Sequence, residues 1–234
     1  MYCCNDREAR KEILNIGKRM YERGFVSAND GNISIRVGEN RIWVTPTGVS
    51  KGYMTEDELV CLDLDGTILE GTARPSSETK MHLRIYRENP VVQAVVHAHP
   101  IISTAFSIAR IPLDVALMTE SVVGLGVVPV APYATTGSQA VPDSVVPYCH
   151  DYHAVLLANH GALTWGETPM QAWYRMESLE CCAAVMQQLG YLEGRKPCVL
   201  SRDEVGELLE VRKKLGVTSG GQPRCREELE KQSD

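Results

Sequence analysis

Residues 94–100 read AVVHAHP, an apolar run that ends in two histidines placed one residue apart and then a proline. A short apolar run of this kind predicts a buried β-strand over residues 91–99. Side chains alternate along a strand, so His97 and His99 are expected on the same face, with Cα atoms roughly 6.6 Å apart. Both imidazoles can then reach one metal ion at roughly 2.0–2.1 Å. Pro100 is expected to open a helix over residues 101–110.

A third histidine ends a second apolar run. Residues 154–166, AVLLANHGALTWG, predict two strands or one strand that bends at Gly161, with His160 directly before the bend. Three histidines alone would make an open metal site, and Glu78 is the candidate fourth ligand. Each residue also has a simpler explanation, because a carboxylate in the first turn of a helix stabilises the helix dipole. We assign the other three histidines to ordinary helix or surface positions: His82, His150 and His153.

The remaining elements follow from periodicity and capping residues. Apolar residues at helical spacing predict helices over residues 5–23, 75–90, 168–190 and 201–216. Ser76 or Ser77 is the expected N-cap of the second helix, and Ser201 with Glu204 forms a capping box on the last. Strands are expected over residues 41–48, 59–69 and 126–133, and prolines favour a sheet edge for the last.

The order of these elements predicts the fold class. Helices and strands alternate in a way that is typical of an α/β domain, with a mostly antiparallel sheet flanked by helices. The sequence contains no internal repeat and no linker, so we expect one domain over residues 1–217. The polar, glycine-rich residues 218–234 are expected to form a flexible tail.

Composition limits the classes of function. The 234 residues are 44% hydrophobic and 23% charged, which suits a globular protein with a sizeable core. A net charge of -6 argues against a nucleic-acid partner. No apolar run approaches the roughly 18 residues of a membrane span, and the charged start is unlike a signal peptide. The eight cysteines form no C-x-x-C pair, so we interpret them as reduced, mostly buried thiols of a cytoplasmic protein, with Cys3, Cys4 and Cys225 exposed.

Three short stretches have the chemistry of an anion-binding site. They are NDGNIS at residues 29–34, TPTG at residues 45–48 and PSSE at residues 75–78. Each offers backbone N–H groups together with Asn, Thr or Ser side chains, and the last opens a predicted helix. Such donors at a helix N-terminus can hold a phosphate without lysine or arginine. The alternative for each stretch is an ordinary turn.

Taken in order, the motifs G-N-I-S, T-P-T-G, P-S-S-E, V-V-H-x-H, APYATTG and N-H-G resemble the class II aldolase/epimerase family, which is similar to the adducin head domain and is typified by L-fuculose-phosphate aldolase. The resemblance covers residues 6–216. It implies a three-layer α/β/α fold with an antiparallel central sheet. It also implies a homotetramer with active sites at the subunit interfaces and a small phosphorylated sugar as substrate.

The resemblance also implies roles for individual residues. His97, His99 and His160 would hold one divalent metal per chain, usually Zn²⁺, with Mn²⁺ or Co²⁺ as alternatives. Glu78 would be the fourth ligand and would exchange protons with the substrate. The residues implied for the substrate phosphate are Asn29, Asn32, Thr47, Gly48, Ser76 and Ser77. Retro-aldol cleavage leaves an enediolate, which a bound metal stabilises as a Lewis acid, so no Schiff-base lysine is needed.

Two tyrosines of the family are missing here. The stretch LDVALM at residues 113–118 has Ala116 where the aldolase has a tyrosine, and KKLG at residues 213–216 has Leu215 in place of the second. In the aldolase both act as acid/base or substrate-orienting groups. Glu120, in the stretch MTESVV, is a candidate replacement acid, and a solvated loop carboxylate is the alternative reading of this residue.

We therefore predict a metal-dependent lyase that cleaves a phosphorylated ketose to dihydroxyacetone phosphate and an aldehyde. The same site residues fit an L-ribulose-5-phosphate 4-epimerase, a methylthioribulose-1-phosphate dehydratase or a sugar-acid phosphate decarboxylase. A non-catalytic adducin-like binding domain would be expected to have lost metal ligands, and all four positions are filled here. An iron oxygenase usually places its carboxylate after the H-x-H motif, whereas Glu78 precedes it.

Overall fold

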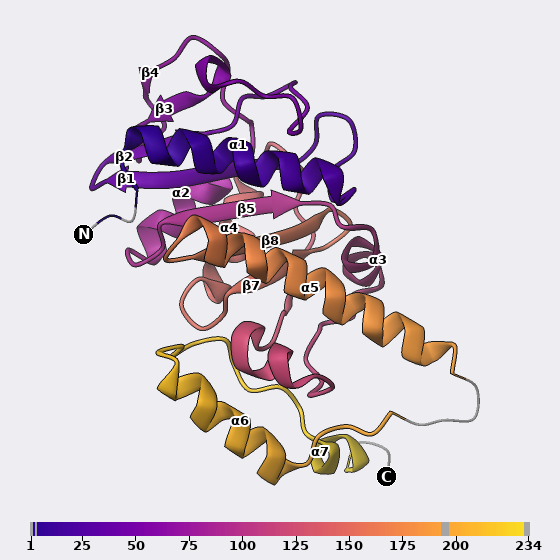
Figure 1. The fold of residues 1–234 in the computed structure, drawn as a ribbon. Coiled ribbons are helices and arrows are strands. Elements are labelled where there is room, and N and C mark those ends of the chain that lie inside the picture. Colours follow the sequence, from indigo (N-terminus) through magenta and orange to yellow (C-terminus); the bar gives the residue numbers. More distant parts are fainter. Residues whose placement is uncertain (1, 3, 193–196, 232–234) are drawn as a thin grey trace.

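One eight-stranded sheet forms the centre of the computed structural model, which describes residue 2, residues 4–192 and residues 197–231 (Figure 1). The strand order is β4-β3-β2-β1-β5-β8-β7-β6. All neighbouring strands of this sheet pair antiparallel except β6 and β7. The strands are β1 (Asn32–Gly38), β2 (Arg41–Val44), β3 (Val60–Leu62), β4 (Ile68–Glu70), β5 (Ala94–Ala98), β6 (Val130–Ala131), β7 (Ala154–Leu157) and β8 (Gly161–Gly166).

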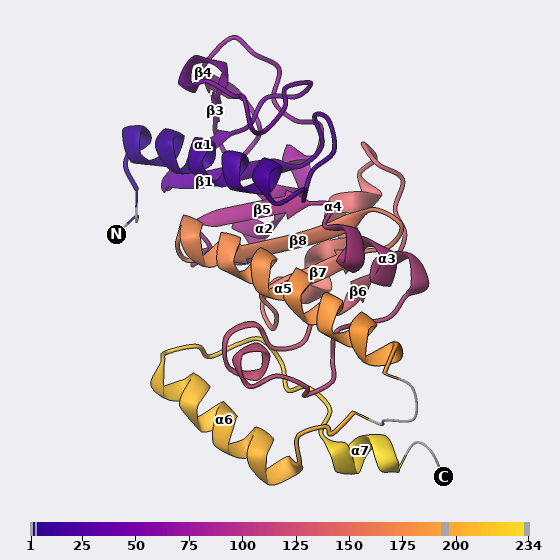
Figure 2. The same ribbon diagram turned by 45° about the vertical axis from the view of Figure 1, so that its right-hand side comes forward.

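Helices cover both faces of the sheet. On one face lie α1 (Asp6–Glu22) and α5 (Pro169–Gly190), and on the other lie α2 (Thr79–Glu88) and α4 (Ala140–Val145) (Figures 1 and 2). Because side chains alternate along β5, Val96 packs into the first layer and Val95 into the second. The predicted three-layer α/β/α fold with a mostly antiparallel sheet is confirmed.

Shorter elements surround these layers. Helix α3 (Ile101–Ala109) follows β5 and packs against α5. Helix α6 (Arg202–Lys214) and the short α7 (Arg226–Glu230) lie beyond the edge of the sheet, beside a helical turn at Ser121–Leu125. Two 3₁₀ turns complete the set, at Glu56–Glu58 and Val146–Tyr148. No helix of the described chain has both the length and the apolar character needed to cross a membrane.

The expected caps form at most helix ends. Asn5 and Glu8 make a capping box on α1, Thr168 caps α5 before Pro169, and Ser201 with Glu204 caps α6. Helix α2 differs, because it begins at Thr79 with Glu78 as its N-cap residue, and neither Ser76 nor Ser77 holds that position. The hydroxyl of Ser76 still accepts a hydrogen bond from the Glu78 N–H.

Strand β1 has no counterpart among the predicted elements. Its residues Ile33 and Ile35 alternate with Ser34 and Arg36, which is the two-residue period of a strand. All four are buried, because β1 lies between β2 and β5 inside the sheet. The polar NDGN stretch before it, which is typical of a turn, concealed this pattern.

The C-terminal residues 218–231 pack against the domain, although the sequence predicts a flexible tail there. The Gly220 N–H donates to Asp151 O, and the Arg224 N–H donates to Asp114 O. Cys225, expected at an exposed position, is fully buried in a small cluster with Ala116 and Val205. Residues 232–234 and Cys3 lie outside the described residues.

Candidate metal centre and phosphate pocket

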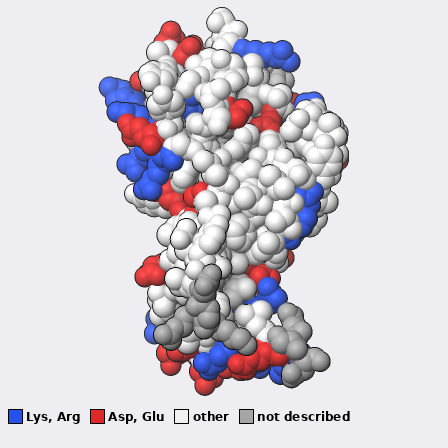
Figure 3. Space-filling view, turned by 90° about the vertical axis from the view of Figure 1, so that its right-hand side faces the viewer, with Lys and Arg blue, Asp and Glu red and all other residues white. Residues whose placement is uncertain are grey.

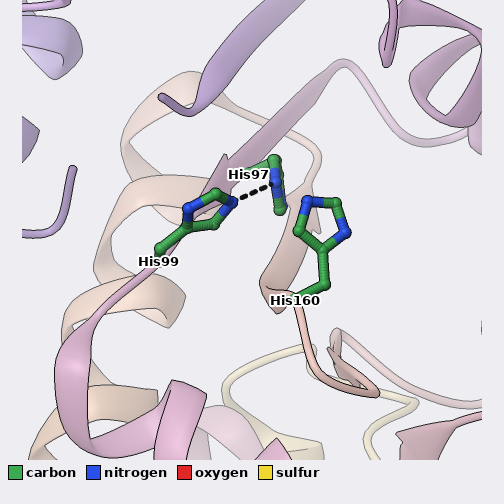
Figure 4. Close-up of side chains that lie close together, drawn as sticks. All are labelled: His97, His99 and His160. Atoms are coloured by element: carbon green, nitrogen blue, oxygen red, sulfur yellow. Dashed lines mark hydrogen bonds between the residues drawn. The ribbon is translucent and has the colours of Figure 1, made fainter. Parts of the chain in front are cut away.

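Three imidazoles meet at one end of the central strands. His97 is on β5, His99 follows this strand directly, and His160 lies in the turn between β7 and β8 (Figure 4). Each ring offers one nitrogen to the same point, and these three atoms lie within 4.8 Å of one another. Gly161 allows this close approach, because a Cβ atom there would lie 2.6 Å from the His99 ring and 2.5 Å from Ala98 O.

Polar contacts on the far side of the His97 and His99 rings orient these two side chains. His97 Nδ1 donates to Ala162 O at 2.9 Å, which turns its Nε2 toward the other two rings. Nδ1 of His99 lies 3.5 Å from Oδ2 of Asp30, and its Nε2 lies 3.0 Å from Nε2 of His97. Partners of this kind set the tautomer and the direction of metal-ligating histidines.

Glu78 reaches this cluster from the start of α2. Its Oε2 lies 3.3 Å from His97 Nε2, and its Oε1 lies 3.0 Å from His160 Nε2. Asn32 stands opposite His97 in the β1–β5 register, and its Nδ2 donates to Glu78 Oε2 at 2.8 Å. The sheet and the helix N-terminus therefore position the carboxylate together.

The electrostatics keep the carboxylate ionised. Burial by itself would raise the pKa of Glu78, but the nearby His97 and His160 imidazoles hold its pKa well below the usual range. Burial, followed by the neighbouring His97 and His160, lowers the pKa of His99 to about 4, so this ring is neutral at pH 7. Burial by itself would lower the pKa of His97, but the adjacent Glu78 raises it, so a metal ion that binds there would displace a proton. Imidazole nitrogens and a carboxylate together are a donor set that fits a divalent transition metal.

A pocket of 370 Å³ opens beside this cluster, within the range of about 300–1,000 Å³ usual for small-molecule sites. Among the sequence-predicted site residues, the structure brings together along its wall Asn29, Asn32, Thr47, Ser76, Ser77, Glu78, His99 and His160. His97 is fully buried and contacts Glu78 and His99. Gly48 follows Thr47 in a turn with a positive φ of 77°, a conformation that favours glycine.

Glu120 is placed differently. This residue does not line the pocket; its carboxylate is exposed and accepts a hydrogen bond from Thr119 Oγ1. His82 and His153, assigned to ordinary helix or surface positions, are both buried, and His82 Nδ1 pairs with Ser34 Oγ at 2.7 Å.

Several residues of the pocket wall are not among the sequence-predicted site residues. Asp30 and Gly31 fall inside the NDGNIS motif and Thr136 inside APYATTG, so the motifs themselves pointed to these positions. Lys51 also lines the pocket, three residues after TPTG. No local pattern distinguishes this lysine from an ordinary surface lysine.

Comparison with known proteins places these observations in a family. The model of the family described as Class II Aldolase and Adducin N-terminal domain matches residues 11–187. The chain is 35% identical over 206 residues to the 3-oxo-tetronate 4-phosphate decarboxylase of Haemophilus influenzae, covering 86% of this chain and 96% of the relative. It is also 35% identical over 182 residues to the L-fuculose phosphate aldolase of Methanococcus maripaludis, covering 77% and 95%.

Solved structures share the fold. An L-fuculose 1-phosphate aldolase superposes with a TM-score of 0.80 at 30% sequence identity, covering 88% of this chain and 96% of that chain. YgbL from Klebsiella pneumoniae gives a TM-score of 0.80 at 30% identity, with 88% and 99% covered.

Proposed function

The chain belongs to the class II aldolase and adducin N-terminal domain family, and from this premise we propose that it is a metal-dependent lyase. Its proposed substrate is a phosphorylated ketose similar to L-fuculose 1-phosphate, and its products are dihydroxyacetone phosphate and an aldehyde. One observation carries the proposal: three histidines and Glu78 converge at a pocket lined by Thr47, Ser76 and Ser77.

His97, His99, His160 and Glu78 would hold one divalent metal ion, with Zn²⁺ as first choice and Mn²⁺ or Co²⁺ as alternatives. When bound, the ion supplies Lewis-acid stabilisation of the negative charge that develops on substrate oxygens. The residues fit such an ion because the three histidine nitrogens face a common point beside Glu78, and polar partners lie on the opposite side of the His97 and His99 rings.

Proton transfer and phosphate binding would be carried out by different side chains of the pocket. Glu78 would hold and move the proton at its carboxylate oxygens, and Asn32 keeps this carboxylate oriented through the 2.8 Å hydrogen bond. The hydroxyls of Thr47, Ser76 and Ser77 would donate to the substrate phosphate, together with Asn29 and Asn32 of the same pocket and the N–H of Gly48 in the adjoining turn.

A second candidate is the decarboxylation of a 3-oxo sugar-acid phosphate. One relative at 35% identity is named for this reaction. Loss of CO₂ from a 2-hydroxy-3-oxo acid also leaves an enediolate, but it needs no base to remove a hydroxyl proton, because the electron pair of the breaking carbon–carbon bond stays on the sugar fragment while the carboxylate leaves as CO₂. This chain has Ala116 and Leu215 where the aldolase has its acid/base tyrosines. A reaction that needs fewer acid/base groups is consistent with this difference, so decarboxylation is the second candidate.

Product analysis separates the two candidates. Metal-loaded protein is incubated with L-fuculose 1-phosphate and other ketose 1-phosphates, and separately with 3-oxo-tetronate 4-phosphate. Aldehyde together with dihydroxyacetone phosphate identifies the aldolase, whereas CO₂ together with dihydroxyacetone phosphate identifies the decarboxylase. Equal turnover of the unphosphorylated sugar would contradict the assignment of the phosphate pocket.

We also propose that the protein assembles as a homotetramer with its sites at subunit interfaces. Helix α3 supports this proposal, because it buries Ser103 and Ser107 and exposes Ile101 and Ile108, at 73% and 55%. It begins two residues after His99, on a side of the molecule with a broad area of few charged side chains (Figure 3). Glu120, which lies outside the pocket of its own chain, would have to act in the pocket of a neighbouring copy.

A further inference from the structure

Lys51 is a buried, positively charged residue in the wall of this pocket, and it lies outside the motifs that supply the neutral donors. Its residue exposure is 1%, although lysine is almost never buried without a partner. Its Nζ donates to Asn29 O at 2.9 Å and to Val49 O at 2.7 Å. Its backbone is pressed against α1, because a Cβ on Gly17 would lie 2.6 Å from Lys51 O.

Two backbone carbonyls hold the ammonium group of Lys51 in place, but no carboxylate forms an ion pair with it among the described residues. It carries three donor hydrogens, and the two carbonyl oxygens account for two of them. Within the described part of the chain, no carboxylate oxygen lies within the 4.0 Å that defines an ion pair with its Nζ. Burial lowers the pKa of Lys51 to about 8. The negative charges of Asp30 and Glu78 act in the opposite direction and raise this pKa, but burial has the larger effect. A buried charge of this kind is costly unless an anion accompanies it.

The position of the charge matches the proposed phosphate site. Lys51 lines the same pocket as Thr47, Ser76 and Ser77, whose hydroxyls are neutral donors. Among the described residues of this wall it is the single lysine or arginine, while Asp30 and Glu78 are acidic. These two carboxylates would oppose the entry of a dianion, and Lys51 is the side chain of this described wall that can offset them together with the proposed metal ion.

We propose that the Lys51 ammonium pairs with the phosphate dianion of the substrate and thereby makes the pocket selective for phosphate esters. This inference rests on the proposed function, since it concerns the phosphate pocket of the same site. Lys51 also ties the turn that contains Asn29 to the turn that contains Val49, so the donors on both turns face one ligand.

The proposal has a pH signature. Lys51 is mostly protonated below its pKa of about 8 and loses its charge above it. A phosphate ester is mostly a dianion above about pH 7, because its second pKa is about 6. Affinity for a phosphate ester should therefore be nearly independent of pH around pH 7.5 and should decline at higher pH. Above its pKa of about 8, Lys51 in the free protein is mostly neutral and must take up a proton before it can pair with the phosphate.

The test uses metal-loaded, full-length protein and glycerol 3-phosphate, a phosphate ester without a carbonyl group to cleave. Calorimetric titration at pH 7.5 should show roughly ten-fold or greater weakening in Lys51→Met, the usual loss for a hydrogen bond to a charged group. Met keeps an unbranched stem of similar length. Lys80→Met removes an exposed lysine of α2 that does not line this pocket, and this variant should bind as the wild type does. The decline above pH 8 should be present in the wild type and absent in Lys51→Met.

Unchanged affinity in a folded Lys51→Met, or an equal loss in Lys80→Met, overturns the proposal. If Lys51→Met does not fold, the wild-type titration decides, and an affinity that stays level from pH 7.5 to 10 overturns it. A wild-type protein that binds glycerol 3-phosphate through Lys51 but cleaves no substrate would contradict the lyase and leave the role of Lys51 intact.

Discussion

His97 Nε2 lies 3.3 Å from Glu78 Oε2, and this contact joins the central sheet to the N-terminus of α2. Asn32, which pairs with His97 across β1 and β5, donates to the same carboxylate oxygen. The carboxylate is thus held between a strand histidine and a strand amide. A metal ligand that also moves protons needs such a fixed position, because a small displacement would separate it from both partners.

Metal content tests the ligand set. Wild-type protein should carry about one divalent ion per chain, and His99→Ala should lose most of it, because two histidines and one carboxylate hold an ion less firmly than four ligands. His150→Ala removes an exposed histidine outside the cluster and is the matched control. Elemental analysis after dialysis measures the occupancy. Full retention of the metal in His99→Ala would contradict the assignment of His99 as a metal ligand.

Replacement of the carboxylate tests the proton transfer. Glu78→Gln keeps the shape and the hydrogen bond from Asn32 but cannot titrate. We expect it to keep part of the metal and to lose roughly 10²–10⁴-fold in kcat, the usual contribution of one positioned acid or base. Steady-state rates with a coupled assay for dihydroxyacetone phosphate measure the loss. An unchanged kcat would show that another group moves the proton.

Glu120→Gln is the companion variant. A loss of similar size is expected if Glu120 replaces a family tyrosine in the site of a neighbouring copy. Because this residue is exposed and lies outside the pocket of its own chain, the variant should fold normally. A wild-type rate in Glu120→Gln would show that Glu120 is a solvated surface carboxylate without a role in the reaction.

The sequence was sufficient to predict the helices with clear caps and the strands with apolar runs, including β5 and β8. Local motifs also identified the proposed metal ligands and most residues of the proposed phosphate pocket. Strand β1 was missed because the turn-like NDGN stretch precedes it and because the partners of its buried Ser34, His82 and Tyr86, are distant in sequence. Lys51 was missed for the same reason, since its partners Asn29 O and Val49 O are backbone atoms brought close by folding.

The C-terminal segment illustrates the same limit. Residues 218–221 are rich in serine and glycine, which is typical of a flexible chain. In the structure the guanidinium of Arg212 donates to Gly221 O and to Val122 O, so this segment is tied to a turn far away in the sequence. Such a contact depends on the tertiary fold and leaves no periodic pattern.

Stability should fall in acid partly through His153. Burial, followed by the nearby Arg175, lowers the pKa of this imidazole from 6.5 to about 3 in the folded protein. Between these values the unfolded chain binds a proton that the folded protein does not, so stability is present above pH 6.5 and is lost as the pH falls. The loss should approach about 1.4 kcal/mol per pH unit at most.

Urea unfolding of metal-loaded protein between pH 7.5 and 4.5 measures this loss. His153→Gln should show a shallower decline than the wild type, and His150→Gln, which changes an exposed histidine, should follow the wild type. Parallel curves for wild type and His153→Gln would contradict the assignment of a neutral buried imidazole.

The exposed face of α3 should mediate assembly. Ile108→Glu places a charge on this apolar face and should reduce the molecular mass measured by light scattering after size exclusion. Ile68→Glu, at a comparably exposed isoleucine on β4, is the control and should leave the mass unchanged. A wild-type protein that is already monomeric, or an Ile108→Glu variant of unchanged mass, would refute the role of α3.

The central claim is that His97, His99, His160 and Glu78 hold a metal that is required for carbon–carbon bond cleavage. The most direct measurement is the rate of dihydroxyacetone phosphate release from the better of the candidate substrates, for metal-loaded, chelator-stripped and reloaded protein and for His99→Ala. We predict release by loaded protein, loss of release on stripping, recovery on reloading with Zn²⁺, Mn²⁺ or Co²⁺, and little release by His99→Ala. Release that persists unchanged after the metal is removed, or that is unaffected by His99→Ala, would contradict the claim.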